Sequence, residues 1–320
     1  MTRLAKGKIV KIMYWSVADA GNLVRVYNEQ LAANVPHCHP VSPEEFEIGI
    51  RYRKDADEPY DELHSEKIIV GEQNGKIVGF ADVVVAEMEE DGQKEYKGLI
   101  RFLTYEPSYR SVGQALLEAS EKHLRDLSMD DISAFRIAFA DDDFSYRFYQ
   151  LGFGLVSDRM MHVCALFRIN GYQINRRKQG EVFLNQPEYS VAEPVLPDSR
   201  VEIAVQQQPG RGVLPGVLAQ ASRGAKEIGL CRSVSVGRYC QASEAQNWGF
   251  IKALYIHEEE QGKGWGRYLL QRNLWEMRKI GYENTVISCD IANYRAQLFY
   301  TNYGYRLVNT GYGFVKNVEV

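Results

Sequence analysis

The sequence predicts a mixed α/β (α+β) protein built from two similar domains in tandem. At 320 residues the chain is longer than a typical single domain, and its length suggests two. Strand-like and helix-like patterns follow one another in nearly the same order in both halves, and several motifs recur at a constant offset. We therefore expect each domain to be a mixed, mostly antiparallel twisted sheet flanked by helices. The predicted first domain covers residues 1–169, the linker 170–200 and the second domain 201–320.

In the first half, hydrophobic periodicity and turn residues predict a strand, two helices and an antiparallel hairpin. The second helix begins at Ser42-Pro43, where Ser42 can cap the first turn. The Asn74-Gly75 pair between two β-rich runs predicts a tight hairpin. The other expected elements are a strand at 99–105, a helix at 113–127, a strand at 132–139, a short helix at 144–150 and a final strand at 160–167.

The second half repeats this order without the two early helices, because the segment between its first two strands is too short for them. The helix at 264–279 has a buried apolar face and a natural stop at Gly281. The other expected elements are strands at 201–205, 217–221, 227–236, 249–256 and 285–289, a helix at 294–301 and closing strands at 305–315.

Composition excludes several function classes. Hydrophobic residues make up 45% and charged residues 25% of the chain, which is ordinary for a globular protein. The formal net charge of −4 argues against a generic nucleic-acid-binding protein, because phosphate binding usually needs a clustered basic surface. The five cysteines show no Cys-x-x-Cys spacing, and no apolar run approaches the ~18 residues that span a bilayer. We expect a cytoplasmic monomer or homodimer without a membrane or nucleic-acid partner.

The two halves match at an offset of 151 residues, which places Leu103 on Leu254. The match continues without a gap as far as Tyr149 and Tyr300, and one residue is then lost. The matched pairs include Arg110 with Gln261, Gly113 with Gly264, Ala115 with Gly266 and Phe148 with Phe299. A constant offset over this length indicates duplication of one domain.

A glycine-rich segment, residues 254–266 (LYIHEEEQGKGWG), joins a strand to a helix. The first amides of a helix have no internal partner and lie at the positive end of its dipole, so such a junction can bind a pyrophosphate. Gly264 and Gly266 would let the phosphates approach the backbone closely. A glycine-rich turn without a ligand is the alternative. No Gly-Lys-Ser or Gly-Lys-Thr closes the segment, which argues against an ATP-type phosphate loop.

The pattern Gln261-x-x-Gly264-x-Gly266 after a strand resembles the R/Q-x-x-G-x-G/A motif of the GNAT acetyltransferase superfamily. Residues 293–305 (NYRAQLFYTNYGY) resemble that family's N-x-x-A-x-x-F-Y-x-x-x-G-F/Y segment. Residues 106–115 (EPSYRSVGQA) also match the first motif, and residues 77–80 (IVGF) resemble the strand that precedes it. The resemblance implies two tandem GNAT-like domains and an N-acetyltransferase that uses acetyl-coenzyme A (acetyl-CoA). The acetyl group would pass to a primary amine by direct attack in a ternary complex.

The same resemblance implies roles for particular residues of the second half. Main-chain N–H groups of Leu254 and Ile256 would stabilise the oxyanion of the thioester, Tyr300 would protonate the departing thiolate, and Asn293 would lie near the cofactor arm. The catalytic set is thus Tyr300, Leu254 and Asn293. The implied cofactor-binding residues are Leu254, Tyr255, Ile256, Gln261, Gly262, Lys263, Gly264, Trp265, Gly266, Asn293, Phe299 and Tyr300.

The general base is not evident. Many relatives carry a glutamate at the strand position of Lys252, and the nearby candidates are His257, Glu244 and Glu258, with a water relay as the alternative. The segment His37-Cys38-His39 lacks a recognised metal-ligand spacing, so we expect no metal site.

The first half is degenerate in its second motif. Asp142 replaces the counterpart of Asn293, and Ser145 replaces that of Ala296. We therefore expect the second half to carry out the chemistry. A second cofactor site would use Tyr105, Arg110, Ser111, Val112, Gly113, Gln114 and Ala115. The acceptor amine, on a small molecule or a protein, is not defined by the sequence, and a non-catalytic acyl-CoA-binding or sensing protein is the alternative function.

Overall fold

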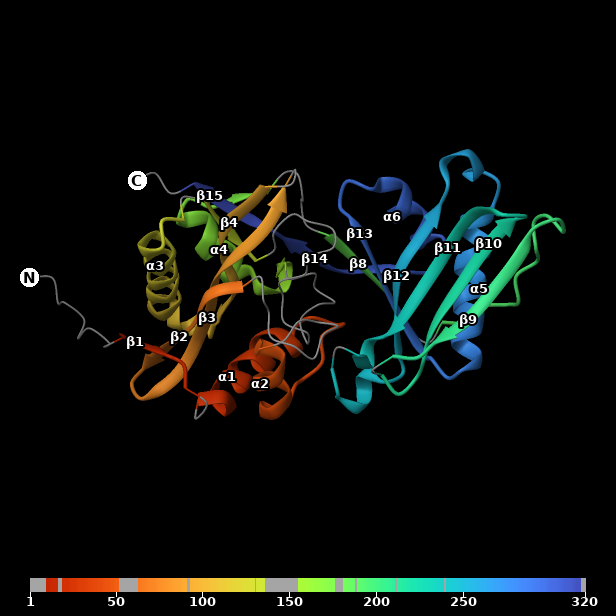
Figure 1. The fold of residues 1–320 in the computed structure, drawn as a ribbon. Helices are drawn as coiled ribbons and strands as arrows, with labels where there is room; N and C mark the ends of the chain where they lie inside the picture. The colour runs from red at the N-terminus through yellow and green to blue at the C-terminus, as the bar shows by residue number, and fades with distance from the viewer. Residues whose placement is uncertain are drawn as a thin grey trace, which may run out of the picture. The chain divides into compact units, whose positions relative to one another are not determined.

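The computed structural model describes residues 10–16, 19–51, 63–90, 93–129, 131–135, 155–175, 181–187, 189–210, 212–238 and 240–317. The chain forms two compact units (Figure 1). The first contains Met1–Glu181, Asp290–Ala292 and Asn309–Val320, and the second contains Val182–Cys289 and Asn293–Val308. Each unit has a mixed, mostly antiparallel sheet with helices against it, which confirms the predicted fold class.

The first unit begins with a strand and two helices and continues with a long antiparallel hairpin. Its sheet has the strand order β1-β2-β3-β4-β5-β15-β7. Its elements are β1 (Val10–Tyr14), α1 (Ala20–Tyr27) with a π-helical extension (Asn28–Ala32), α2 (Pro43–Arg51), β2 (Leu63–Gln73), β3 (Lys76–Glu90), β4 (Gln93–Tyr105), α3 (Arg110–Asp126), β5 (Asp131–Ala134), β6 (Val156–Ser157), α4 (Met161–Ile169), β7 (Gln173–Ile174) and, from the chain's end, β15 (Phe314–Asn317).

Two local predictions for this unit are confirmed. Asn74 and Gly75 both have positive φ, 55° and 79°, as a two-residue turn between β2 and β3 requires. Ser42 Oγ accepts a hydrogen bond of 3.1 Å from the N–H of Glu45 and so caps α2. Turn and cap residues therefore define the ends of these elements.

Helices cover both faces of the first sheet. Neighbouring residues of a strand face opposite sides, and Gly79 and Phe80 of β3 illustrate this. Phe80 packs edge-on against Phe46 of α2, with ring centroids 5.8 Å apart. A Cβ atom at Gly79 would lie 3.0 Å from Leu116 of α3. The hydrophobic core thus lies in two layers, between the sheet and α1 with α2, and between the sheet and α3.

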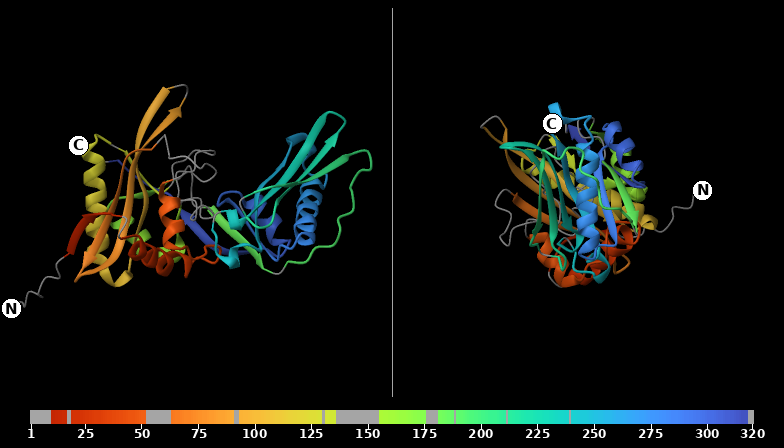
Figure 2. Two further views of the ribbon diagram at one scale, coloured as in Figure 1. Left: turned by 60° about the horizontal axis from the view of Figure 1, so that its bottom comes forward. Right: turned by 90° about the vertical axis from the view of Figure 1, so that its right-hand side faces the viewer.

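The second unit has α5 against one face of its sheet, and Figure 2 shows this packing from two sides. The strand order of the second sheet is β6-β14-β8-β13-β12-β11-β10-β9, and the pairing of β6 with the end of β14 (Gly311↔Ser157) belongs to the first unit. As predicted, residues 209–215, which link its first two antiparallel strands, contain no helix among the positions that the structure describes. Its elements are β8 (Glu181–Pro187), β9 (Glu202–Gln208), β10 (Gly216–Arg223), β11 (Lys226–Ser235), β12 (Trp248–Ile256), α5 (Trp265–Lys279), β13 (Asn284–Asp290), α6 (Tyr294–Thr301) and β14 (Arg306–Tyr312).

The end of the chain completes the first sheet rather than the second. Strand β15 pairs with β5 through Phe314↔Ala134 and with β7 through Phe314↔Ile174. The predicted second domain, 201–320, therefore differs from the second unit in its last residues. The predicted linker, 170–200, contains the division between the units and also the strands β7 and β8.

The prediction of a strand at 160–167 is wrong, because this segment forms α4. Val163, Cys164, Leu166 and Phe167 are buried, which is the spacing of one helical face. A short apolar run does not distinguish a buried strand from a buried helix. In the first sheet, β5 pairs with β15, which comes from the end of the chain. The predicted helix at 144–150 lies outside the described residues.

Candidate functional site

Two parallel strands of the second sheet pair over only part of their length. The ladder between β12 and β13 ends at Ile251↔Ile287. Beyond it, β12 continues to Ile256 and β13 to Asp290, while β12 stays paired with β11 to its end. Among the described residues, the last part of β12 therefore has a strand partner on one edge only.

The main-chain groups on that edge can be assigned from the ladder. The N–H of His257 donates to the Ile228 carbonyl at 3.0 Å. Alternate residues of an antiparallel pair point their N–H and C=O groups to the same neighbour, so Leu254 and Ile256 point theirs away from β11. The Gln261 Nε2 amide donates to the Ile256 carbonyl at 3.1 Å, as this direction requires. The N–H groups of the two predicted oxyanion donors, Leu254 and Ile256, thus point to the edge of β12 that no longer pairs with β13.

The turn after β12 has the backbone conformation that its glycines allow. Gly262 and Gly264 have φ of 77° and 89°, in the left-handed region that favours glycine. A Cβ atom at either position would meet no atom within 4 Å. Residues 261–264 are all exposed. The loop is therefore open on its outer side.

Six successive backbone amides of this turn have no carbonyl partner among the residues that the structure describes. Within the described parts of the chain, no carbonyl accepts from the N–H groups of residues 262–267, and the first donor of α5 is Tyr268, to Gly264 at 3.0 Å. These amides lie at the positive end of a 15-residue helix. The arrangement is suited to an anion such as a diphosphate.

Side chains hold this loop in place. Glu260 is buried and pairs with Arg223 at 3.0 Å and with Lys263 at 3.2 Å. Hydrogen bonds from Lys263 and Arg223 lower the pKa of the Glu260 carboxyl, although its burial opposes this. Trp265, only 2% exposed, anchors the first residue of α5. The loop conformation is thus fixed from the protein side.

Tyr300 of α6 is buried near the ends of β12 and β13, where these two strands no longer pair with each other. Burial raises the pKa of its phenol, and the thiols of Cys231 and Cys289 raise it further. Cys231 is the register partner of Leu254, and Cys289 lies beyond the last ladder pair on β13. The phenol therefore stays protonated at neutral pH and can donate a proton.

Asn293 has a structural role in the fold. Its Oδ1 accepts a hydrogen bond of 3.1 Å from the N–H of Ala296 and caps α6. Phe299 packs between Tyr300 and Tyr303, with ring centroids 5.5 Å and 5.2 Å away. These contacts fix the direction in which α6 presents Tyr300.

The candidate bases lie on the surface of the second unit. His257 is bonded through Nδ1 to the Tyr255 hydroxyl at 3.3 Å, and its Nε2 lies 3.6 Å from Glu227. Tyr255 is half exposed, and Glu258 and Glu244 are exposed. The geometry gives none of the candidates priority as a base.

The matching junction of the first unit is built differently. Arg110 matches Gln261, yet α3 already begins at Arg110, whereas α5 begins only at Trp265. Residues 261–264 form the open glycine loop of the second unit, whereas the four matching residues of the first unit, 110–113, are helical. The second motif of this half, 142–153, lies outside the described residues.

Side chains of the first unit also fill the space around its junction. A Cβ atom at Gly113 would lie 2.5 Å from the ring of Tyr105, which is buried. The Tyr105 hydroxyl donates to the carbonyl of His162 at 3.1 Å. The side-chain amides of Gln114 and Asn170 bond each other at 2.9 and 3.0 Å. Of the remaining predicted residues Val112 is buried, Ala115 is half-buried and Ser111 is exposed.

Each sheet has a β-bulge before its junction. In the first unit the extra residue is Arg101, which is fully buried and paired with Asp82 and Glu66. In the second it is Lys252, which is exposed. Sequence reasoning singled out Lys252 and missed this buried ion cluster, because the pairing register that links Arg101 to Asp82 is not visible in the sequence.

The fold is thus that of a tandem α/β protein whose two units repeat one sheet plan, with an open strand-to-helix junction in the second. Two family models match the chain: "Acetyltransferase (GNAT) family" over residues 29–153 and "Acetyltransferase (GNAT) domain" over residues 218–307. The chain belongs to the GNAT acetyltransferase superfamily and is a tandem member with two such domains.

Solved structures share this fold at low sequence identity. A tandem GNAT protein from the clavulanic acid biosynthesis pathway has 10% identity and a TM-score of 0.65, with 98% of this chain and 99% of that chain covered. A GCN5-related N-acetyltransferase from Sphaerobacter thermophilus has 12% identity, a TM-score of 0.61 and coverages of 97% and 96%.

A third structure is the glucosamine N-acetyltransferase region of a fungal multi-domain β-N-acetylglucosaminidase. It has 14% identity and a TM-score of 0.65; the match covers 97% of this chain, but the chain spans only 38% of that protein's length. The search of curated proteins found no sequence match. At these identities the neighbours establish the fold alone.

The described residues contain no group of three or more His, Cys, Asp or Glu side chains placed to hold a metal ion. None of the helices that the structure describes has the length and apolar character needed to cross a membrane.

Proposed function

We propose that the second unit binds acetyl-CoA and transfers its acetyl group to a primary amine in a ternary complex. The observation that carries the proposal is the run of six backbone amides, residues 262–267, that have no carbonyl partner among the described residues and lie next to the unpaired end of β12. These amides would hold the diphosphate of the cofactor, with Gln261 and Lys263 beside them. The open outer side of Gly264 fits such a ligand, because no atom of the described residues would lie within 4 Å of a Cβ atom there.

In this proposal the chain positions the reacting atoms and stabilises charge. The acceptor nitrogen attacks the thioester carbon, and the N–H groups of Leu254 and Ile256 donate to the oxygen on which negative charge develops. The carbon–sulfur bond then breaks, and Tyr300 donates its proton to the sulfur. The proton lost by the amine passes to water, and Tyr300 recovers its own proton from solvent.

A thiol-release assay over a panel of primary amines tests the catalytic part of the proposal, and we expect at least one amine to release the thiol of coenzyme A.

The melting temperature tests the binding part of the proposal. We expect acetyl-CoA to raise it, since a ligand at 100 times its Kd stabilises the folded state by about 2.7 kcal/mol. ATP should not do so. Stabilisation by ATP but not by acetyl-CoA would support a nucleotide-binding protein and refute this proposal.

A non-catalytic acyl-CoA-binding or sensing function is the second candidate. The observation that favours it is the exposed Lys252 at the bulge, where many relatives have a glutamate. This candidate predicts acetyl-CoA binding without thiol release from any amine of the panel. The buried and protonated phenol of Tyr300 favours the enzyme.

A further inference from the structure

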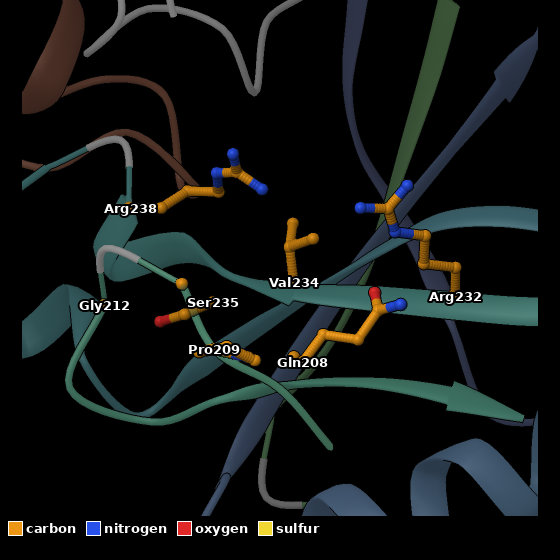
Figure 3. A pocket seen from close by; sticks show the side chains of 9 residues that line it. Gln208, Pro209, Gly212, Arg232, Val234, Ser235 and Arg238 are labelled. Carbon is orange, nitrogen blue, oxygen red and sulfur yellow. The ribbon is translucent and has the colours of Figure 1, made fainter. Parts of the chain in front are cut away.

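One face of the second sheet carries a small pocket lined by two arginines. Figure 3 shows Arg232 and Arg238 on the same side of the sheet, on either side of Val234. Arg232 and Val234 lie on β11, and Arg238 ends the 3₁₀ turn Val236–Arg238 that follows it. The side-chain amide of Gln208, at the end of β9, lies beside Arg232. Every lining residue belongs to the second unit.

This face is the one that α5 does not cover. Alternate residues of a strand share a face, so Arg232 lies opposite Cys231 and Ser233. Cys231 and Ser233 are fully buried, and Asn273 of α5 donates to the carbonyl of Cys231 at 3.0 Å. Arg232, in contrast, is exposed. Its guanidinium is therefore accessible to a ligand.

The pocket also lies close to the proposed point of transfer. Arg232 is the register partner of Ala253, and Ala253 precedes Leu254, whose N–H faces the unpaired edge of β12. Neighbouring strands are about 4.8 Å apart. An acceptor held at Arg232 could thus place its amine at the thioester with only a few bonds between the two groups.

The loop that lines the pocket occupies the place of two helices. In the first unit, α1 and α2 connect β1 to β2 and cover one face of the sheet. In the second unit, residues 209–215 make the corresponding connection, and Pro209, Gly210 and Gly212 line the pocket. The face of the sheet that α1 and α2 cover in the first unit is therefore lined by a short loop in the second.

The two sheets differ in charge at one position beside their bulges, where an aspartate of the first unit matches an arginine of the second. In the first unit, Asp82 pairs with the bulge residue Arg101, and both are buried. In the second unit the same two positions hold Arg232 and Lys252, both exposed. The formal charge of the pair thus changes from zero to +2. Among the described residues, none forms a hydrogen bond or an ion pair with the Arg232 side chain.

Because guanidinium groups bind carboxylates and phosphates through paired hydrogen bonds, this face is suited to an anion. We propose that Arg232 and Arg238 bind an anionic group, a carboxylate or a phosphate, of the acceptor amine, so that the acceptor is an amino acid-like or phosphate-bearing amine. This inference rests on the proposed acetyl transfer in the second unit. It adds the class of acceptor and the residues that select it.

The test compares matched amines that differ in their anionic group. At saturating coenzyme A, titration calorimetry measures the binding of 4-aminobutanoate against butylamine, 6-aminohexanoate against hexylamine, and phosphoethanolamine against ethanolamine. We expect the wild type to bind the anionic member of at least one pair at least tenfold more tightly. The pair that shows the preference identifies the group as carboxylate or phosphate.

Variants then assign the preference to the pocket. Arg232→Gln and Arg238→Gln should each reduce it at least fivefold, whereas Arg232→Lys should retain most of it because the charge remains. Lys279→Gln removes one charge from α5, on the opposite face, and should leave it unchanged. Melting temperatures of all variants verify folding.

Two results overturn the inference: no preference in any pair, or a preference that survives both Arg232→Gln and Arg238→Gln. Coenzyme A binding is titrated separately in the same samples. Normal coenzyme A binding without a preference removes this inference alone, whereas absent coenzyme A binding removes the proposed function and this inference with it.

Discussion

The two strand-to-helix junctions of this protein have matching sequences and different structures. In the second unit, Gly262 and Gly264 adopt positive φ and leave the following amides open. In the first unit, the matching residues are already helical, and the ring of Tyr105 lies against Gly113. The motif Arg110-x-x-Gly113-x-Ala115 is thus compatible with a closed junction. Ligand binding depends on the backbone conformation of the loop as well as on its glycines.

The two β-bulges also differ, because Arg101 of the first is buried and Lys252 of the second is exposed. The free energy of unfolding of variants at these positions should show this difference. Arg101→Ala should lower the free energy of unfolding by about 3–5 kcal/mol, because it leaves the buried carboxylate of Asp82 without its partner. Lys252→Ala, at the exposed matching position, should change it by less than about 0.5 kcal/mol. Urea unfolding measures both, and equal effects would show that the two bulges are alike.

The second prediction concerns the open loop. Gly264→Glu places a carboxylate among the free amides, and we expect acetyl-CoA affinity to fall at least 100-fold, about 2.7 kcal/mol. Gly224→Glu is the matched control, since this glycine also has positive φ and open space around it but lies in the β10–β11 turn. Calorimetry should find normal affinity in the control. An equal loss in both variants would attribute the effect to backbone strain.

The third prediction concerns the proton donor. Tyr300→Phe should lower kcat by about 10–100-fold with little change in acetyl-CoA affinity. Tyr303→Phe, one turn away in the same aromatic cluster, should leave kcat within about twofold, because the half-buried ring is kept and only its hydroxyl is lost. Because burial raises the pKa of the Tyr300 phenol above its ordinary value, the phenol stays protonated at neutral and mildly alkaline pH. A kcat limb near pH 8–9 that disappears in Tyr300→Phe would contradict this assignment.

The smallest effect is expected at the cap of α6. Asn293→Ala removes the acceptor for the N–H of Ala296 and should destabilise the second unit by about 1 kcal/mol. Calorimetric melting measures this change, with Asn293→Asp as a variant that keeps the cap. If kcat falls more than tenfold while the melting temperature is unchanged, Asn293 contacts the reactants instead.

Local signals predicted much of this structure. The Asn74-Gly75 turn, the Ser42 cap and the helix at 264–279 followed from turn chemistry and periodicity. The fold class followed from the repeat and the resemblance. The residues of the second junction, from Leu254 to Gly266, could be named because one strand, one turn and one helix are contiguous in the chain.

Long-range pairing set the limits of prediction. Nothing in the segment 314–317 indicates that it joins the first sheet, because its partners β5 and β7 are far away in the sequence. The helix α4 was mistaken for a strand because a short apolar run does not distinguish a buried strand from a buried helix. The contrast between Asp82 and Arg232 became visible only once the register of β3 with β4 and of β11 with β12 was known.

Amide hydrogen exchange with and without coenzyme A tests the central claim most directly. The free amides of residues 262–267 should exchange rapidly in the protein alone and become protected when coenzyme A binds, while residues 110–115 should not change. Protection confined to residues 110–115, or no protection at 262–267 under saturating coenzyme A, would contradict the account.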